Sequence, residues 1–159
     1  EFIFLTAGWK YNRHWLMNNP DEIFYWISRN KQSGGKLSYF RKIEPIFLFG
    51  KPKNKYNLDY FDYNSDRLDK LRELHTCPKP VEFVGEAISV TDKSDIVLDI
   101  FLGSGTTMIA CEKINRICYG IELDPRYCDV IVERWQNFTG KEAIRESDNV
   151  KYNDLKEGE

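Results

Sequence analysis

The stretch at residues 97–110, which reads VLDIFLGSGTTMIA, decides the fold of this 159-residue chain. A short apolar run containing Asp99 leads to two glycines one residue apart, Gly103 and Gly105, and then to a run typical of a helix. Glycines at the turn from a strand to a helix let the backbone pass close to a ligand, because they carry no Cβ. The plain alternative is a tight turn that binds nothing.

The segments around this turn alternate between helix and strand patterns. The sequence predicts helices at 78–92, 105–115 and 124–138, and apolar strands at 95–101 and 116–123. Asp124 and Pro125 are typical of the cap and the first residue of a helix. Helices that alternate with apolar strands over short connections indicate a parallel sheet covered on both faces. We therefore expect an α/β fold with a three-layer, mostly parallel sheet.

The N-terminal part has a different pattern. Residues 1–8, 22–28 and 43–50 predict strands, the last two as an antiparallel hairpin with a long polar connection. Residues 52–74 are charged and poorly patterned, so we expect a linker or an irregular excursion there. Residues 141–159 form a polar tail that we expect to be frayed. The length fits one domain overall.

Charge is distributed unevenly along the chain. The net charge is −2, yet residues 1–58 contain ten Lys or Arg against four Asp or Glu. Basic side chains interleaved with Trp and Tyr are compatible with a surface that faces a polyanion. The alternative is an ordinary solvated charged face, and the acidic remainder argues against indiscriminate binding of nucleic acid.

Several classes of protein are not expected. The chain has no apolar run of about 18 residues and no basic leader, which predicts neither a transmembrane helix nor a signal peptide. The four cysteines, Cys77, Cys111, Cys118 and Cys128, form no C-x-x-C pair. We expect reduced thiols in a cytoplasmic protein and no metal. The chain lacks an initiator Met and opens on a strand, which suggests a piece of a longer protein.

The end of the second strand narrows the ligand class. Glu122 lies 17 positions after Gly105, close to the separation at which a carboxylate accepts hydrogen bonds from ribose hydroxyls. A dinucleotide motif requires a third glycine where this chain has Met108, and a P-loop requires a Lys where it has Thr106. S-adenosylmethionine (SAM) has neither a pyrophosphate nor a triphosphate, so these absences favour SAM over NAD.

Three blocks of the sequence resemble the amino-DNA methyltransferases, which modify adenine N6 or cytosine N4. They are HTCPKP at 75–80, DIFLGSGTT at 99–107 and GIELDPRYCDVIVERW at 120–135. The family patterns are H-x-x-x-K-P, then D-x-F-x-G-S-G-T-T, then G-x-E-x-x-x-x-Y with an Arg later in the helix. The order resembles the subgroup whose catalytic block precedes the cofactor blocks.

The resemblance is close over 75–138 and looser over 1–51, where LTAG, FYWIS and IEPIFLFGK resemble strands that follow the catalytic block. It is absent from 52–74. The resemblance implies a Rossmann-like SAM-dependent methyltransferase fold, incomplete at the N-terminus, with SAM as cofactor and DNA as partner. It makes 1–51 the strands and basic loop of the DNA-facing half, and 75–140 the SAM-binding half. We further expect a homodimer or the missing N-terminal part of the same protein as a partner, and no membrane. We expect a cytoplasmic protein of prokaryotic or viral origin.

The resemblance also assigns residues. Those for the cofactor are Lys79, Pro80, Asp99, Phe101, Gly103, Ser104, Gly105, Thr106, Thr107, Glu122, Leu123 and Asp124. Those facing DNA are Arg29, Lys31, Lys36, Arg41 and Lys42. Lys79 and Pro80 would border the methionine end of SAM. The turn would hold its amino and carboxylate groups, and Glu122 would accept hydrogen bonds from the ribose. The plain alternatives are a helix start at Pro80, a satisfied polar group at Asp99 and a helix cap at Asp124.

The family's catalytic block, (D/N/S)-P-P-(Y/F/W), is not found, because the chain contains no Pro-Pro pair. Residues 124–127 read DPRY, with Arg126 in place of the second proline, and 19–22 read NPDE, without an aromatic residue. We therefore assign no catalytic residue and expect this chain alone to transfer no methyl groups. The alternatives are an inactive SAM- or DNA-binding homologue or accessory subunit, and a nicotinamide-dependent oxidoreductase.

Overall fold

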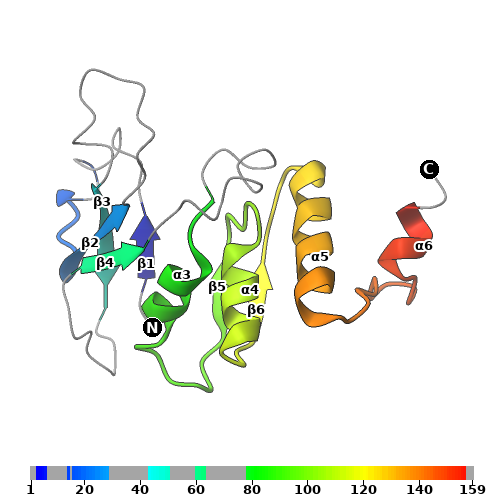
Figure 1. Cartoon of the computed structure of the whole chain (residues 1–159). Helices are drawn as coiled ribbons and strands as arrows, with labels where there is room; N and C mark the ends of the chain where they lie inside the picture. Colours follow the sequence, from blue (N-terminus) through cyan, green and yellow to red (C-terminus); the bar gives the residue numbers. More distant parts are fainter. Residues whose placement is uncertain are drawn as a thin grey trace.

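A computed structural model describes residues 3–6, 14, 16–28, 43–50, 60–63 and 78–156. The strands are β1 (Ile3–Thr6), β2 (Glu22–Ser28), β3 (Ile43–Phe49), β4 (Tyr60–Tyr63), β5 (Val97–Asp99) and β6 (Cys118–Gly120). The helices are α3 (Val81–Ile88), α4 (Thr106–Lys113), α5 (Pro125–Thr139) and α6 (Tyr152–Lys156). Figure 1 shows β1–β4 on the left, α3 beside them, β5 and β6 with α4 in the middle, and α5 and α6 on the right.

The N-terminal strands form one sheet in the order β1-β3-β2-β4. β3 pairs antiparallel with β2, Glu22 opposite Leu48, which confirms the predicted hairpin. β3 also pairs antiparallel with β1, Ile3 opposite Phe49. The aromatic and β-branched side chains of these runs favour strands, because they pack well on a pleated surface. Strand β3 therefore lies inside the sheet, between β1 and β2.

The expectation of an irregular excursion over 52–74 is corrected at residues 60–63. These form β4, which pairs parallel with β2 and places Tyr25 opposite Tyr60. The run Tyr-Phe-Asp-Tyr is short, and its pairing partner lies more than thirty positions earlier in the sequence. Local pattern does not report such a long-range contact, although the three aromatic residues suit a strand. The remainder of 52–74 lies outside the described residues.

Helix α3 covers the four-stranded sheet. Pro80 is its N-cap residue, and Phe83 and Ala87, four positions apart, form its buried face. Phe83 packs in a cluster with Phe24, Ile46 and Leu48 of the sheet. This cluster joins the N-terminal strands to the part of the chain that contains the two glycines.

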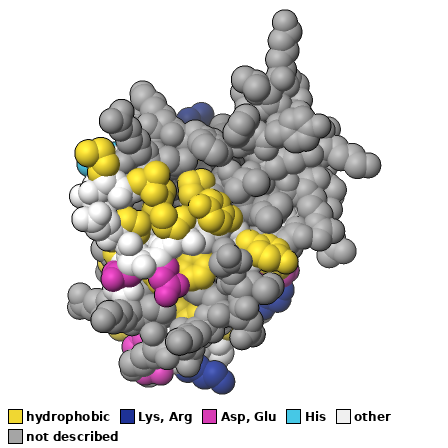
Figure 2. Space-filling view, turned by 90° about the vertical axis from the view of Figure 1, so that its left-hand side faces the viewer, with side chains coloured by type: hydrophobic (Ala, Val, Ile, Leu, Met, Phe, Trp, Pro, Cys, Tyr) yellow, Lys and Arg dark blue, Asp and Glu magenta, His cyan; other side chains and the backbone are white. Residues whose placement is uncertain are grey.

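On its outer side the same sheet carries exposed apolar side chains. Figure 2, which views the molecule from the left of Figure 1, shows hydrophobic side chains gathered at the centre of this face. The exposed large hydrophobic residues of this part of the described chain are Leu16, Met17, Tyr25 and Tyr60.

The predicted parallel pairing is present between β5 and β6, with Val97 opposite Cys118 and Asp99 opposite Gly120. Helix α4 connects them, and α5 follows β6 with the predicted Asp124 cap and Pro125 start. Both strands are three residues long, shorter than predicted. β5 ends early because the Asp99 side chain accepts a hydrogen bond from the Phe101 backbone N–H and turns the chain.

Within the described residues, α4 contacts β6 and covers one face of this two-stranded sheet. The side chains that alternate along both strands on the other face are exposed. They are Ile96, Leu98 and Ile100 along the first strand, and Ile117, Tyr119 and Ile121 along the second. A helix is thus found on one face of this pair of strands in the part of the chain that the structure describes.

The polar tail is more ordered than expected. Residues 144 and 151 form an antiparallel bridge, and α6 follows it. The Tyr152 hydroxyl donates to Asp129 of α5 at 3.0 Å, and the Ala143 backbone N–H donates to Gln136 at 2.8 Å. Polar contacts to α5, rather than an apolar stripe, hold this segment, so hydrophobic pattern does not predict it. No helix in the described part of the chain is long and apolar enough to cross a membrane.

Candidate functional site

The loop between β5 and α4 is fastened at both ends by Asp99. One carboxylate oxygen accepts from the Phe101 backbone N–H at 3.0 Å, and the other accepts from the Thr107 hydroxyl at 2.6 Å. Asp99 thus joins the exit of the strand to the first turn of the helix. The plain reading of Asp99 as a satisfied polar group holds, and the same bonds shape the loop.

Two glycines give the loop its path. Gly103 has φ 57° and Gly105 has φ 77°, both in the left-handed region that favours glycine. A Cβ at Gly105 would lie 3.2 Å from side-chain atoms of Ile131 on α5. Sequence reasoning explains this glycine by the approach of a ligand. The structure gives a different reason, which is backbone conformation and the close packing of α5.

Glu122 points at this loop, as predicted. Its Oε2 accepts from the Gly103 backbone N–H at 2.7 Å. Its Oε1 accepts from the backbone N–H groups of Leu123 and Asp124 at 2.8 and 3.0 Å. These bonds hold the pKa of Glu122 below its usual value, and the bond from the Asp124 backbone N–H has the largest effect. The carboxylate is therefore ionised near neutral pH and fixed between the loop and the start of α5.

Asp124, two residues after this carboxylate, is accounted for by local structure. The Asp124 side chain caps α5 by accepting from the Arg126 backbone N–H at 3.0 Å, and it forms an ion pair with the Arg126 guanidinium. The guanidinium holds the pKa of Asp124 below its usual value. Pro80 is buried at the start of α3. The carbonyl of Lys79 accepts from the Thr106 hydroxyl at 3.3 Å, which places that backbone against the first residue of α4.

Two apolar side chains stand exposed beside the loop and the carboxylate. Phe101 is 84% exposed and Leu123 is 94% exposed. They occupy the ends of the two strands, Phe101 two residues after β5 and Leu123 next to Glu122. Large apolar groups that project from a loop next to a fixed carboxylate are suited to contact a flat, partly apolar ligand.

The third block of the family pattern contains an Arg later in the helix without a stated role, and this residue, Arg134, holds the far side of the loop. Arg134 of α5 donates from Nη1 to the Ser104 carbonyl, and Ser104 itself is buried. Arg134 lies three positions after Ile131, so both lie on the helix face that contacts the loop. A charged residue on the inward face of an amphipathic helix is the signal that could have identified it.

Met108, the residue that argues against a dinucleotide motif, lines a cavity of about 400 Å³ between α4 and α5. Trp135 and Cys118 line the same cavity. Met108 thus lines the cavity on the side of α4, whereas a dinucleotide motif has a glycine at this position for close packing of the helix on the strand.

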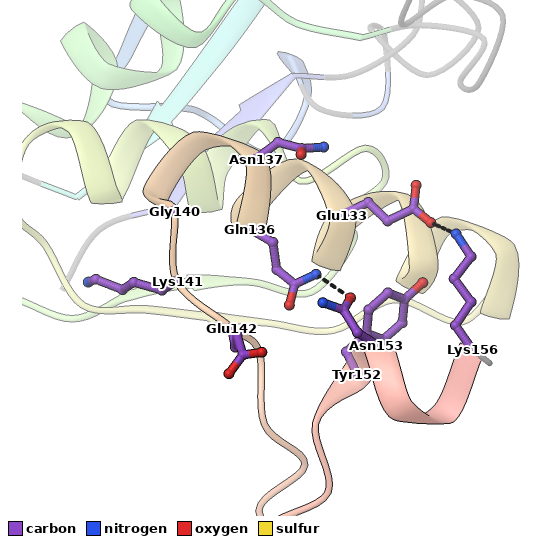
Figure 3. A pocket seen from close by; sticks show the side chains of 9 residues that line it. All are labelled: Glu133, Gln136, Asn137, Gly140, Lys141, Glu142, Tyr152, Asn153 and Lys156. Atoms are coloured by element: carbon purple, nitrogen blue, oxygen red, sulfur yellow. Dashed lines mark hydrogen bonds and ion pairs between the residues drawn. The ribbon is translucent and has the colours of Figure 1, made fainter. Parts of the chain in front are cut away.

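A polar cavity of about 440 Å³ lies between α5, α6 and the segment that connects them (Figure 3). Its lining side chains pair with one another: Lys156 with Glu133, and Gln136 with Asn153 at 3.1 Å. None of the predicted cofactor residues lines it. The loop and Glu122, rather than this cavity, bring the predicted residues together.

The predicted DNA-facing residues, Arg29, Lys31, Lys36, Arg41 and Lys42, lie outside the described residues. Among the residues that are described, no group of three or more His, Cys, Asp or Glu is placed to hold a metal ion.

Comparison with known proteins finds relatives among the type II methyltransferases. A protein with 27% identity over 119 residues is the type II methyltransferase M.BglII from Bacillus subtilis; the match covers 73% of this chain and 33% of that protein. The type II methyltransferase M.HpaI from Haemophilus parainfluenzae is 32% identical over 119 residues, with 74% and 36% covered. The chain thus spans about one third of the length of these relatives.

Two solved structures have a similar fold. The M1.HpyAVI–SAM complex superposes with a TM-score of 0.67 at 25% identity, covering 84% of this chain and 74% of that one. The PvuII DNA methyltransferase, described as cytosine-N4-specific, gives a TM-score of 0.66 at 18% identity, covering 84% and 62%. The α/β fold is therefore the Rossmann-like fold of the DNA methyltransferases.

The family model described as DNA methylase matches residues 3–133, which include the four-stranded sheet, the glycine loop and most of α5. The match covers well over half of the chain, and it includes both glycines and the carboxylate that lies against them. The chain therefore belongs to the N6/N4 DNA methylase family.

Proposed function

We propose that this chain is the SAM-binding portion of a DNA methyltransferase that acts on an exocyclic base amine, adenine N6 or cytosine N4. The observation that carries the proposal is Glu122, ionised and hydrogen-bonded to the turn that contains Gly103. Family membership and the likeness to a methyltransferase solved with SAM support the choice of cofactor.

The acceptor groups of Glu122 and the apolar side chains beside it suit a nucleoside. A carboxylate has about four acceptor positions. Backbone N–H groups occupy three of them at Glu122, and Oε2 accepts only one of these bonds. Glu122 therefore keeps capacity for a ribose hydroxyl. Phe101 and Leu123 offer exposed apolar surface for the adenine ring, and Met108 in place of a glycine disfavours a dinucleotide.

The remaining predicted residues would act on the amino-acid end of SAM. Asp99, fastened to both ends of the turn, keeps residues 101–107 in one shape, and Lys79 and Pro80 lie next to Thr106. SAM supplies an electrophilic methyl group on a sulfonium. The part played by this chain is to bind and orient that donor.

The acceptor side of the reaction requires groups that this chain does not contain. A base amine has its lone pair delocalised into the ring, so hydrogen-bond acceptors must take up its N–H bonds before it attacks the methyl group. The base must also leave the duplex and stack on an aromatic ring. We assign these tasks to a Pro-Pro block that is not part of this sequence. The chain alone would then be inactive, with the basic residues between 29 and 42 facing DNA phosphates.

Binding of SAM is the first test. Isothermal titration of the chain with SAM is expected to show saturable binding, and titration with NAD none. Loss of charge-assisted hydrogen bonds in Glu122→Gln is expected to weaken SAM binding by roughly 10- to 100-fold. Glu142→Gln is the matched control, since Glu142 is exposed and pairs with Lys151. Binding of NAD alone, or equal SAM affinity in both variants, would contradict the proposal.

Turnover is the second test. The chain incubated with DNA and methyl-labelled SAM is expected to leave the DNA unlabelled. Incorporation of label would disprove the inactivity while keeping the assignment of the cofactor.

The missing Pro-Pro pair favours a second candidate, a homologue that binds SAM or DNA without turnover. The reading frame upstream of residue 1 separates the two. An upstream D-P-P-Y-like block supports the enzyme, and a full-length protein without one supports the inactive homologue.

A further inference from the structure

Arg134 of α5 differs from the other cations of the same helix region. Arg126 is exposed and paired with Asp124, whereas Arg134 is partly buried. Burial lowers the pKa of the Arg134 guanidinium. Within the described residues no carboxylate forms an ion pair with it, and its hydrogen bond goes to the Ser104 carbonyl. Keeping a cation partly buried costs desolvation free energy, so packing alone does not explain an arginine here.

The hydrogen bond fixes one peptide unit of the glycine loop. Its carbonyl, from Ser104, accepts from Arg134, and its N–H, from Gly105, donates to the Leu102 carbonyl at 2.9 Å. Both ends of this peptide are therefore held. The flanking residues Gly103 and Gly105 have the widest conformational freedom of any residue type, so the loop depends on outside contacts to keep one shape.

Helix geometry explains how a residue in the third turn of α5 reaches the loop. Side chains on a helix tilt toward its N-terminus, so a long side chain at Arg134 extends back toward the carboxyl ends of the strands. Ile131, three residues earlier on the same face, contacts the position of Gly105. One helix therefore touches both ends of the site: it begins beside Glu122 and holds the loop through Arg134.

We propose that Arg134 is a positioning residue that holds the Ser104–Gly105 peptide, and with it the part of the loop that receives the amino-acid end of SAM. This inference rests on the proposed function. It adds a role for a side chain that does not itself touch the donor. An arginine suits the task because its guanidinium stays charged when partly buried and its planar N–H groups are rigidly directed.

The test separates the two ends of the donor. SAM has an amino-acid tail that would lie on the loop, whereas adenosine has only the part that would lie at Glu122. Loss of the loop contact in Arg134→Met is expected to weaken SAM binding by about 10-fold, the size of one hydrogen bond to a charged group, and adenosine binding by less than about 2-fold. Arg134→Lys, which keeps one charged donor, is expected to recover part of the SAM affinity.

The control is Arg145→Gln, because Arg145 is exposed and pairs with Asp148 outside the site. Each titration is made below the unfolding temperature of the variant, which circular dichroism gives. The unfolding midpoint of Arg134→Met is expected to stay close to that of the unchanged chain, because the removal of a partly buried charge offsets the loss of the hydrogen bond.

Each outcome decides the inference. Unchanged SAM affinity in Arg134→Met, or an equal loss for SAM and adenosine, overturns it while the proposed function stands. Failure of the unchanged chain to bind SAM overturns the proposed function, and this inference with it. Where Arg134→Met does not fold, Arg134→Lys and Arg134→Gln carry the same comparison of SAM with adenosine.

Discussion

The two sheets of this molecule are stabilised in different ways. In the four-stranded sheet, three consecutive residues of β3, Ile46, Phe47 and Leu48, are 0% exposed, so both faces of that strand are covered. In the two-stranded sheet, Leu98 of β5 is 64% exposed and Tyr119 of β6 is 61% exposed. Apolar burial thus reaches both faces of β3 in the first sheet, whereas in the second sheet it is found on the side of α4.

The difference bears on where function lies. The candidate site belongs to the sheet with less apolar burial, and backbone hydrogen bonds to Asp99 and Glu122 give it its shape. Binding residues often lie on loops that a more rigid scaffold positions. Here α3 is the connection, since it packs on the four-stranded sheet through Phe83 and contacts α4. We therefore expect stability and binding to respond to substitutions in different regions.

The largest effect is expected in the core. Phe83→Ala removes a ring that is 1% exposed and leaves a cavity between α3 and the sheet, so unfolding should become easier by about 3–5 kcal/mol. Chemical denaturation followed by circular dichroism measures the change. A loss below about 1 kcal/mol would mean that the cluster around Phe83 is not the core of the molecule.

A smaller effect is expected in the glycine loop. Gly105→Ala places a Cβ on a residue with φ 77°, and that Cβ lies 3.2 Å from Ile131. The free energy of unfolding should therefore fall by about 1–2 kcal/mol. The free energy of SAM binding should fall by more than this amount. The matched control is Gly85→Ala, in α3, where no atom lies within 4 Å of the added Cβ. That variant should gain about 0.5–1 kcal/mol. Equal losses of stability in Gly105→Ala and Gly85→Ala would contradict the importance of the Gly105 backbone conformation.

The contact between β4 and α3 is expected to contribute about 1 kcal/mol, through the Tyr63 hydroxyl that donates to Glu86. Burial and this bond raise the pKa of Tyr63 from 10.0 to about 12. Because the folded pKa is raised, the contribution is complete below pH 10 and is lost as pH rises through about 12. The difference in denaturation midpoint between the unchanged chain and Tyr63→Phe should shrink over that range. Tyr60→Phe is the control.

Acid is expected to act weakly on the site. The folded pKa of Glu122 is lowered from 4.5, so its contribution to stability is present above about pH 4.5 and is lost as pH falls through the folded value. Solvent screens much of this effect, since the carboxylate is little buried. Denaturation midpoints of the unchanged chain and Glu122→Gln should converge below pH 4. A constant difference from pH 7 to pH 3 would exclude an ionised Glu122 as the cause.

The smallest effect is expected on the exposed face of β5. Leu98→Thr keeps a strand-forming residue and removes no buried contact within the described residues, so stability should change by less than about 0.5 kcal/mol. A loss as large as that of Phe83→Ala would show that this face is covered in solution, and would remove the difference between the two sheets.

The sequence predicts the parts of the fold whose signals are local. Helix α5 has its cap, Asp124, and its first-turn proline, Pro125, in adjacent positions, and both are found in place. The approach of Glu122 to the glycine loop follows from the length of one βαβ unit, which leaves little choice of path. The predicted hairpin also follows from two aromatic-rich runs of equal length.

What the sequence does not predict depends on partners that are distant or polar. β4 pairs with a strand far away in the sequence. The tail and α6 lie on α5 through side-chain hydrogen bonds, which leave no periodic pattern. Arg134 is visible as a residue, but its contact with Ser104 is known only once α5 is placed beside the loop.

The three backbone bonds at Glu122 have a thermodynamic consequence for any nucleoside that binds there. In the chain without ligand, the carboxylate already has partners, and one of them is the N–H of Gly103. A ribose hydroxyl that takes the remaining acceptor position of Oε2 meets a carboxylate that is already held in place, so binding pays little for ordering this side chain. Affinity would then come from this hydrogen bond as well as from the apolar ring contacts, and the glutamate also selects which sugar can enter.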